Sequence, residues 1–327
     1  MAGDTPTLAV DELKTYFFTK AGVVKAVDDV SFAVERGHIV GLVGESGCGK
    51  TVTGFSIIGL VDAPGKVVGG RILFKGDDLL ALPEQQIQRL RGTRIAMIFQ
   101  DPMMTLNPVL RIDTQMIETI LAHEKVSRDE AWRRSRDALG KIGIASPEER
   151  MKAYPHQFSG GMRQRVSIAI ALLHKPDLII ADEPTTALDV TIQGQILYEI
   201  QKLCRETATS LIWITHDLSV IAGLADQVCV MYAGKIVESG DVDPVLDDPL
   251  HPYTRGLIGS VPGHSRRGEP LQQIPGMTPS LLNLPAGCPF RPRCPRASRS
   301  CLEMPSIASL QIGREVRCFH PHLGDRV

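Results

Sequence analysis

Three stretches of the chain alternate apolar and polar residues, a pattern typical of short strands that bury one face. They cover residues 10–16, 23–34 and 71–74. All three lie in the first quarter of the chain. We therefore predict a small antiparallel sheet in this part of the molecule.

Continuous apolar runs follow a different pattern, which is typical of buried strands. They cover residues 39–43, 178–181, 210–215 and 228–232, and helix-like stretches lie between the later ones. Strands that alternate with helices are the repeating unit of a parallel α/β sheet. The sequence therefore predicts an α/β fold with a parallel core sheet.

The middle of the chain has helical spacing. Charge-rich helical patterns cover residues 84–91 and 127–142. The second pattern begins at Ser127 with Glu130 three residues later, an order that resembles a capping box. We therefore expect a helical insert at about residues 101–160.

The sequence changes in character after Asp241, where prolines become frequent and regular periodicity fades. We place a domain boundary near Gly240. This gives one domain at residues 1–240 and a small, irregular domain rich in cysteine and proline at residues 241–327.

Composition narrows the possible partners and compartments. The 327 residues are 43% hydrophobic and 22% charged, with a formal net charge of -1. No global field therefore attracts nucleic acid, and we expect no nucleic-acid partner. No apolar stretch is long enough to span a bilayer, and no export signal is visible at Met1–Asp4. We expect a cytoplasmic location with reduced thiols.

A glycine-rich loop lies between the apolar run 39–43 and a helix-like run at 52–60. It consists of Gly44, Glu45, Ser46, Gly47, Cys48, Gly49, Lys50 and Thr51. Glycines let successive backbone N–H groups and the N-terminus of the following helix face one anion. Lys50 would contact the β- and γ-phosphates of a nucleotide, and Thr51 would bind Mg²⁺. The loop therefore predicts nucleotide binding.

The thiol of Cys48 lies at the predicted helix N-terminus, where the pKa of a thiol can be lowered. Cys48 can equally be a small residue in place of the usual serine. A lowered pKa would make nucleotide turnover sensitive to alkylation of this thiol, with protection by the bound nucleotide and Mg²⁺.

Two carboxylates follow the apolar run 178–181. Asp182 is the candidate for the magnesium side of a phosphoryl-transfer site, and Glu183 is placed to polarise a water for attack on the γ-phosphate. The alternative for Glu183 is an acidic helix cap.

A second anion-binding helix N-terminus is predicted at residues 159–162. Ser159, Gly160, Gly161 and Met162 come directly before a helical pattern that extends to Leu173. A Ser-Gly-Gly turn alone would mean little, but here it accompanies a phosphate loop and an Asp-Glu strand end.

The order and spacing of these motifs resemble those of the ATP-binding-cassette family, over nearly the whole chain. Residues 159–162 are similar to the family signature, although Met162 replaces the commoner Gln. Gln100 resembles the Q-loop glutamine, Asp189 the D-loop aspartate and His216 the switch histidine. Tyr16 is the residue that we expect to stack on adenine.

The resemblance implies a P-loop NTPase core of the RecA-like kind, with an antiparallel β subdomain and the helical insert. It also implies a head-to-tail dimer in which ATP lies between the loop of Lys50 and the Ser159 motif of the other subunit. His216 and Glu183 would act in hydrolysis. Gln100 would lie at the magnesium ion and report the γ-phosphate to the helical insert.

Four of the seven cysteines, Cys288, Cys294, Cys301 and Cys318, lie in the proline-rich region with five, six and sixteen residues between neighbours. Reduced thiols argue against disulfides. Four thiolates could bind zinc, but zinc ribbons usually have closer pairs. An iron–sulfur cluster is the alternative. Arg291, Arg293, Arg296 and Arg299 would offset the negative charge of either group.

These cysteines, together with residues 251–255 (His-Pro-Tyr-Thr-Arg), resemble the ATPase subunits of bacterial di- and oligopeptide importers, most of all those that carry dipeptides. The resemblance implies a [4Fe–4S] cluster. It also implies a second, non-identical ATPase subunit, two membrane permease subunits and a periplasmic solute-binding protein. The chain would be peripheral, on the cytoplasmic face of the inner membrane.

Other cargoes and another function remain open from the sequence. The same family includes importers of nickel and other solutes, so the match does not name the cargo. A cassette ATPase that acts on DNA or ribosomes is a further alternative. Such proteins usually have two cassettes or a long coiled coil, and this chain has one phosphate loop and no sustained heptads.

Overall fold

The computed structural model describes residues 5–185, 190–260, 273–311 and 313–323. The chain divides into two compact units. Residues 1–81 and 213–327 form the first unit, and residues 82–212 form the second. In the described residues, no helix is both long and apolar enough to cross a bilayer.

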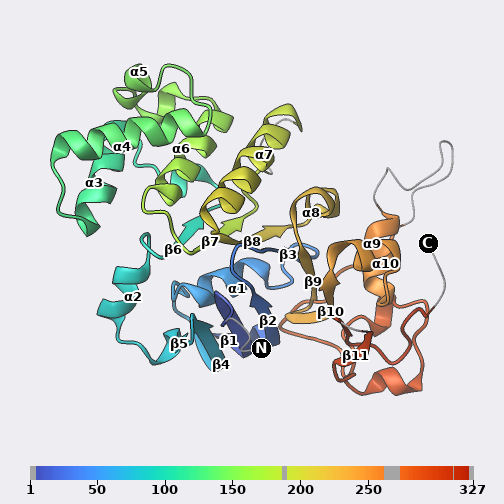
Figure 1. Cartoon of the computed structure of the whole chain (residues 1–327). Helices are drawn as coiled ribbons and strands as arrows, with labels where there is room; N and C mark the ends of the chain where they lie inside the picture. The colour runs from blue at the N-terminus through green and yellow to red at the C-terminus, as the bar shows by residue number, and fades with distance from the viewer. Residues whose placement is uncertain (1–4, 186–189, 261–272, 312, 324–327) are drawn as a thin grey trace. The chain divides into compact units, whose positions relative to one another are not determined.

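The first unit contains a four-stranded antiparallel sheet (Figure 1). Its strands are β1 (Leu8–Thr19), β2 (Gly22–Val34), β4 (Gly65–Phe74) and β5 (Asp77–Asp78), in the order β2-β1-β4-β5. The three alternating stretches of the sequence fall within β1, β2 and β4. The predicted antiparallel sheet is therefore confirmed, with longer strands than the pattern indicated.

A second sheet in this unit combines parallel and antiparallel pairs. Strand β3 (Ile39–Val43) pairs in parallel with β9 (Gln227–Tyr232), and β9 pairs antiparallel with β10 (Lys235–Asp241). Two short strands follow in the sheet, β12 (Arg314–Val316) and β11 (Ala308–Gln311). All five residues of β3 are buried, as a continuous apolar run predicts.

Four α-helices of the described residues belong to the first unit. They are α1 (Lys50–Ile57), α8 (Leu218–Leu224), α9 (Val242–Asp247) and α10 (Pro252–Gly259). The predicted helix at 52–60 is α1, which begins two residues earlier. Helix α9 directly follows β10 and packs against it (Figure 1).

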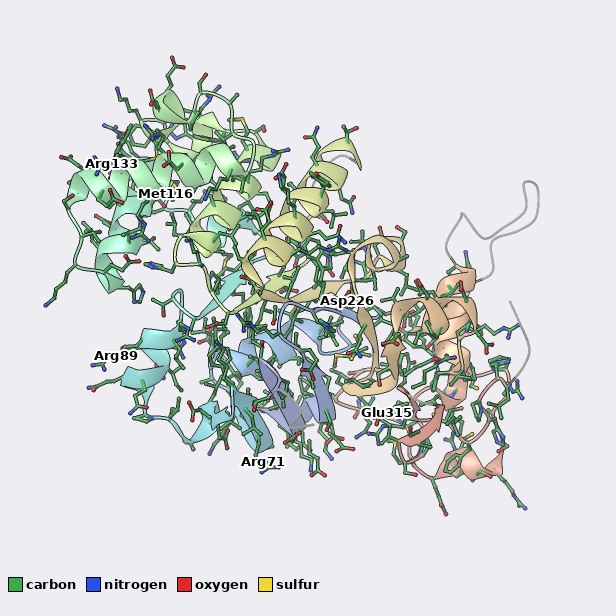
Figure 2. All side chains as sticks on the ribbon, viewed as in Figure 1. Arg71, Arg89, Met116, Arg133, Asp226 and Glu315 are labelled. Atoms are coloured by element: carbon green, nitrogen blue, oxygen red, sulfur yellow. The ribbon has the colours of Figure 1, made fainter. Side chains whose placement is uncertain are left out.

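The second unit is rich in helices. Its helices are α2 (Glu84–Leu90), α3 (Ile112–His123), α4 (Arg128–Lys141), α5 (Pro147–Met151), α6 (Gly160–Leu172) and α7 (Val190–Thr207). Figure 1 shows α3 to α6 as one group. Met116 of α3 is fully buried, whereas Arg133 of α4 is an exposed partner of Glu130 (Figure 2).

Helix α4 begins where the sequence predicts. The hydroxyl of Ser127 accepts a hydrogen bond from the backbone N–H of Glu130 at 3.2 Å. This bond satisfies one of the N–H groups that the first turn of a helix leaves without a partner.

Two strands of the second unit pair in parallel. They are β6 (Ile95–Ile98) and β7 (Leu178–Asp182), with Ile98 opposite Ala181. Strand β8 (Ser210–Thr215) is the neighbour of β7 and crosses the division between the units. Every residue of β7 and β8 is buried.

Candidate functional site

The loop at residues 44–49 connects β3 to α1 through backbone conformations that only glycine adopts easily. Gly44 has φ 153° and Gly49 has φ 108°. A Cβ atom on Gly44 would lie 2.2 Å from the carbonyl oxygen of Met231, and one on Gly49 would lie 2.1 Å from that of Ala26. Both positions therefore require glycine, for conformation and for space.

Lys50 places its positive charge inside the curve of this loop. Its ammonium group donates hydrogen bonds to the carbonyl oxygens of Gly44 at 2.7 Å and Glu45 at 3.1 Å. The residue is only 4% exposed. Thr51 follows as the second residue of α1 and is half-buried. The loop therefore combines a helix N-terminus with a fixed cation, which is the arrangement of an anion site.

The expectation of a lowered pKa for Cys48 is wrong. The residue is fully buried, and this burial raises the pKa of its thiol although the charge of Lys50 acts in the opposite direction. Desolvation outweighs the helix N-terminus and the neighbouring cation here. Cys48 is therefore a small packing residue in this loop.

Glu45 contacts three residues that are distant in the chain. Its carboxylate accepts two hydrogen bonds from Arg293, at 2.7 and 2.9 Å, and one from the hydroxyl of Thr278 at 2.7 Å. Its backbone N–H donates to the hydroxyl oxygen of Tyr253 at 2.9 Å. Sequence analysis missed these contacts, because Glu45 and Arg293 are 248 residues apart.

Tyr16 contacts two charged side chains of the protein itself. Its hydroxyl donates to Asp28 at 2.6 Å, and the ammonium of Lys25 lies 5.4 Å from the centre of the ring. Burial and then Asp28 raise the pKa of this hydroxyl. The next aromatic but one, Phe18, is 51% exposed.

His216 follows β8 directly and is exposed. The next residue, Asp217, caps α8 by accepting a hydrogen bond from the N–H of Ser219 at 2.9 Å. The switch position therefore lies in the short connection between a buried strand and a capped helix.

In the second unit, Asp182 is the last residue of β7 and is 3% exposed. Glu183 follows with φ 42°, a left-handed conformation that is uncommon for a residue with a side chain. Gln100 comes two residues after the end of β6. Since β6 and β7 pair in parallel, all three residues emerge at the same edge of the sheet.

The Ser159 motif forms the start of α6. The hydroxyl of Ser159 accepts a hydrogen bond from the N–H of Met162 at 3.3 Å, and Gly160 and Gly161 form the first turn. A Cβ atom on Gly160 would meet nothing within 4 Å, so the helix N-terminus is open on this side. Asp189 lies outside the described residues.

The four C-terminal cysteines line one small cavity together with His251, Phe290 and His320. None of them forms a disulfide. Burial raises the pKa of Cys288 and Cys294 above the usual thiol range, and raises that of Cys318 to about 11. Four thiols round one cavity have the donor chemistry of a metal–thiolate site. Among the described residues, however, no group of three or more His, Cys, Asp or Glu side chains is arranged to hold a metal ion.

Comparisons with known proteins show where these features occur together. Residues 27–186 match the family model described as "ABC transporter", and residues 237–301 match the "Oligopeptide/dipeptide transporter, C-terminal region". The oligopeptide transport ATP-binding protein OppD of Escherichia coli is 48% identical over 96% of this chain and 93% of its own length. This chain belongs to that family of ABC transporter ATP-binding proteins.

Other relatives agree with this membership. The dipeptide transport ATP-binding protein DppD of Bacillus subtilis is 50% identical over 90% of this chain and 88% of its own length. The dimeric structure of MJ0796, described as a bacterial ABC transporter cassette, matches with a TM-score of 0.66 at 24% identity. It covers 72% of this chain and 98% of the MJ0796 chain. The predicted family, the P-loop NTPase fold and the activity of a transport ATPase are therefore confirmed.

Proposed function

We propose that this ABC ATPase hydrolyses ATP on the loop of residues 44–51 to drive the import of di- and oligopeptides. The conformation of that loop supports the proposal, because its glycines allow the backbone to curl round Lys50, whose charge suits a polyphosphate. Tyr16 is proposed to stack on the adenine. The names of the relatives support peptides as the cargo.

Five residues are proposed to position the reaction. Thr51, Asp182 and Gln100 are proposed to hold Mg²⁺ and its water shell, and the metal would neutralise charge on the phosphates. Glu183 would polarise the attacking water, and His216 would contact the γ-phosphate. Positioning and electrostatic stabilisation provide most of the catalysis in phosphoryl transfer.

A second ATPase subunit, non-identical to this chain, is proposed to complete the site. Its signature motif would cover the ATP on this loop, and Ser159, Gly160, Gly161 and Met162 here would cover the ATP of the partner. Asp189 would lie at the same interface. The open N-terminus of α6 supports this role. Binding of ATP would close the dimer and its hydrolysis would release it.

Membership of the family supports a proposal for the other partners and the location. We propose that the chain works with two transmembrane permease subunits and a periplasmic solute-binding protein, as a peripheral subunit on the cytoplasmic face of the inner membrane. Residues 1–240 would form the nucleotide-binding domain, with a helical subdomain at about 101–160, and residues 241–327 the domain that carries the cysteines.

We further propose that Cys288, Cys294, Cys301 and Cys318 bind a [4Fe–4S] cluster rather than zinc. Such a cluster supplies either a structural cross-link or a one-electron redox centre. The four thiols that line one cavity support this proposal. Anaerobically purified protein should be brown, contain about four iron atoms per chain and bleach with dithionite. Cys301→Ser should lose the iron and Cys204→Ser should retain it, whereas a colourless protein with one zinc would favour the alternative.

The test of the ATPase site is Glu183→Gln in the complex with its partner subunits. Removing a positioned base should lower ATP turnover by about 10²–10⁴-fold and leave a closed, ATP-bound dimer. Glu206→Gln, on the exposed side of α7, is the matched control and should hydrolyse ATP normally. Full activity of Glu183→Gln, or an open dimer at saturating ATP, would contradict the proposal.

A further inference from the structure

We propose that Arg293 is a positioning residue for the phosphate-binding loop, so that the C-terminal region of the chain sets the affinity for ATP. Arg293 lies between two of the cavity cysteines, far from the loop in sequence, and contacts Glu45 through both carboxylate oxygens. This inference rests on the proposed nucleotide site at residues 44–51.

The contact between Arg293 and Glu45 is well enough fixed to position a loop. A bidentate arginine–carboxylate pair fixes orientation as well as distance, because both groups are planar. The side chain of Arg293 is 5% exposed and that of Glu45 is 27% exposed. The Nε atom of Arg293 also donates to the carbonyl oxygen of Pro275 at 2.9 Å, which fixes the guanidinium from its other side.

The backbone turn that carries Arg293 is also held in place. The residue ends a short 3-10 helix (Arg291–Arg293), and its N–H donates to the carbonyl oxygen of Phe290 at 2.9 Å. The ring of Phe290 packs on the rings of Tyr232 and Tyr253, with centroids 5.2 and 5.4 Å apart. An aromatic cluster therefore holds the turn that presents Arg293.

The backbone of the loop is also held at Glu45. Its N–H is bonded to Tyr253 and its carbonyl oxygen to Lys50, so the peptide units on both sides of its Cα are held. The contact between the carboxylate and Arg293 then restricts the side chain, which is the part of the residue that can still move. A loop fixed before binding loses less conformational entropy when the phosphates bind.

Arg293 has a second effect, because it neutralises Glu45 beside the place proposed for the phosphates. Burial acts to raise the pKa of Glu45, but hydrogen bonds from Arg293 and Thr278 outweigh it and lower the pKa. The carboxylate is therefore ionised at neutral pH. Without Arg293 its charge would repel the phosphates, as well as leave the loop unfixed.

The experiment measures binding of MgADP to the purified full chain by titration calorimetry, and then KM and kcat for ATP in the assembled transporter. Arg293→Gln should raise the Kd for MgADP about tenfold. It should also raise KM for ATP while kcat changes less than about twofold, since a positioned binding loop acts before the chemical step. Arg293→Lys keeps the charge but not the bidentate geometry and should bind with intermediate affinity.

Two further variants separate the two effects of Arg293. Adding Glu45→Gln to Arg293→Gln removes the unbalanced charge, so the double variant should recover part of the lost affinity but remain weaker than the wild type. Arg71→Gln is the matched control, because Arg71 pairs with Asp11 at 3.2 Å with 65% and 42% of the side chains exposed (Figure 2). An exposed pair of this kind should leave the Kd unchanged.

The outcomes are distinguishable. Unchanged affinity in folded Arg293→Gln or Arg293→Lys, while Lys50→Ala abolishes binding, would overturn the role of Arg293 and leave the nucleotide site intact. Unchanged affinity in Lys50→Ala would overturn the site itself. If Arg293→Gln does not fold, Arg293→Lys and Thr278→Val decide the question, since each weakens the hold on Glu45 by one interaction.

Discussion

Among the described contacts that join the C-terminal region to the rest of the first unit, two arginine–glutamate pairs differ in depth. In the loop contact, Arg293 pairs with Glu45, whose side chain is 27% exposed. In the sheet contact, Arg314 of β12 pairs with Glu238 of β10 at 2.9 Å, and the side chain of Glu238 is completely buried. The same pair of residue types therefore occurs once beside solvent and once in the interior.

The two carboxyl groups respond to this difference in opposite ways. The pKa of Glu45 is lowered, because hydrogen bonds outweigh its partial burial. Burial raises the pKa of Glu238, although the N–H groups of Leu250 and His251 and the guanidinium of Arg314 all donate to it. Depth rather than partner type decides the sign. The sheet contact is suited to hold the fold, and the loop contact to adjust a binding site.

The largest expected effect is on the sheet contact. Glu238→Ala removes the carboxylate that pairs with the buried guanidinium of Arg314, and with it the acceptor of two N–H groups at the start of α10. We expect a loss of about 3–5 kcal/mol in the free energy of unfolding, measured by urea denaturation. Glu315→Ala, at the exposed neighbouring position of β12 (Figure 2), should cost less than about 0.5 kcal/mol. Equal effects of the two variants would remove the distinction between the contacts.

The second prediction concerns Tyr253, which joins the loop contact from the side of the backbone. Tyr253→Phe keeps the buried ring and removes the acceptor of the Glu45 N–H. We expect a loss of about 1–3 kcal/mol in the free energy of unfolding, the range for an unsatisfied buried donor. Tyr198 of α7 is 62% exposed, so Tyr198→Phe is the control and should leave the free energy of unfolding unchanged. A neutral result for Tyr253→Phe would show that solvent replaces the hydroxyl.

The parts of the molecule that could be predicted from sequence are those whose chemistry is local. The loop at 44–49 can be recognised in the sequence because its backbone conformation requires glycines. Strand β3 can be recognised because a fully buried strand is continuously apolar. Helix α3 was missed, although its buried positions, 112, 116, 117 and 120, have helical spacing. Residues 65–70 of β4 were missed because three glycines among them weaken the strand pattern.

The loop contact and the sheet contact could not be predicted from the sequence. Glu45 and Arg293 both lie outside regular strands, so no periodicity relates them. The pairing of β10 with β12 joins residues on both sides of the predicted boundary near Gly240, and β12 has only three residues. Contacts of this kind depend on the packing of the whole unit, which local propensity does not determine.

The third prediction uses pH, and the two contacts should give slopes of opposite sign. The folded pKa of Glu45 lies below its unfolded value, so its stabilisation is present above about pH 4.3 and is lost as pH falls. The folded pKa of Glu238 lies above its unfolded value, so its contribution is present at low pH and is lost as pH rises.

The measurement is the free energy of unfolding of the wild type minus that of each Glu→Gln variant, between about pH 7 and pH 2. This difference should shrink for Glu45→Gln and grow for Glu238→Gln as the pH is lowered. Each slope is limited to about 1.4 kcal/mol per pH unit, because one proton is involved. Slopes of the same sign would show that depth does not separate the two contacts.

The smallest effect concerns the thiols that flank the loop contact, and it alters labelling rather than stability. Burial raises the pKa of both thiols, but Cys48, three residues after Glu45, is 0% exposed, whereas Cys294, next to Arg293, is half-buried. Since alkylation needs an accessible thiolate, iodoacetamide should modify Cys294 at least about tenfold faster than Cys48 in metal-free native protein. Mass spectrometry of the peptides would measure both rates, with urea-unfolded protein as the control in which they converge. Equal rates in the native protein would show that the loop opens often enough to expose Cys48, and therefore that the contact with Arg293 does not keep the loop closed.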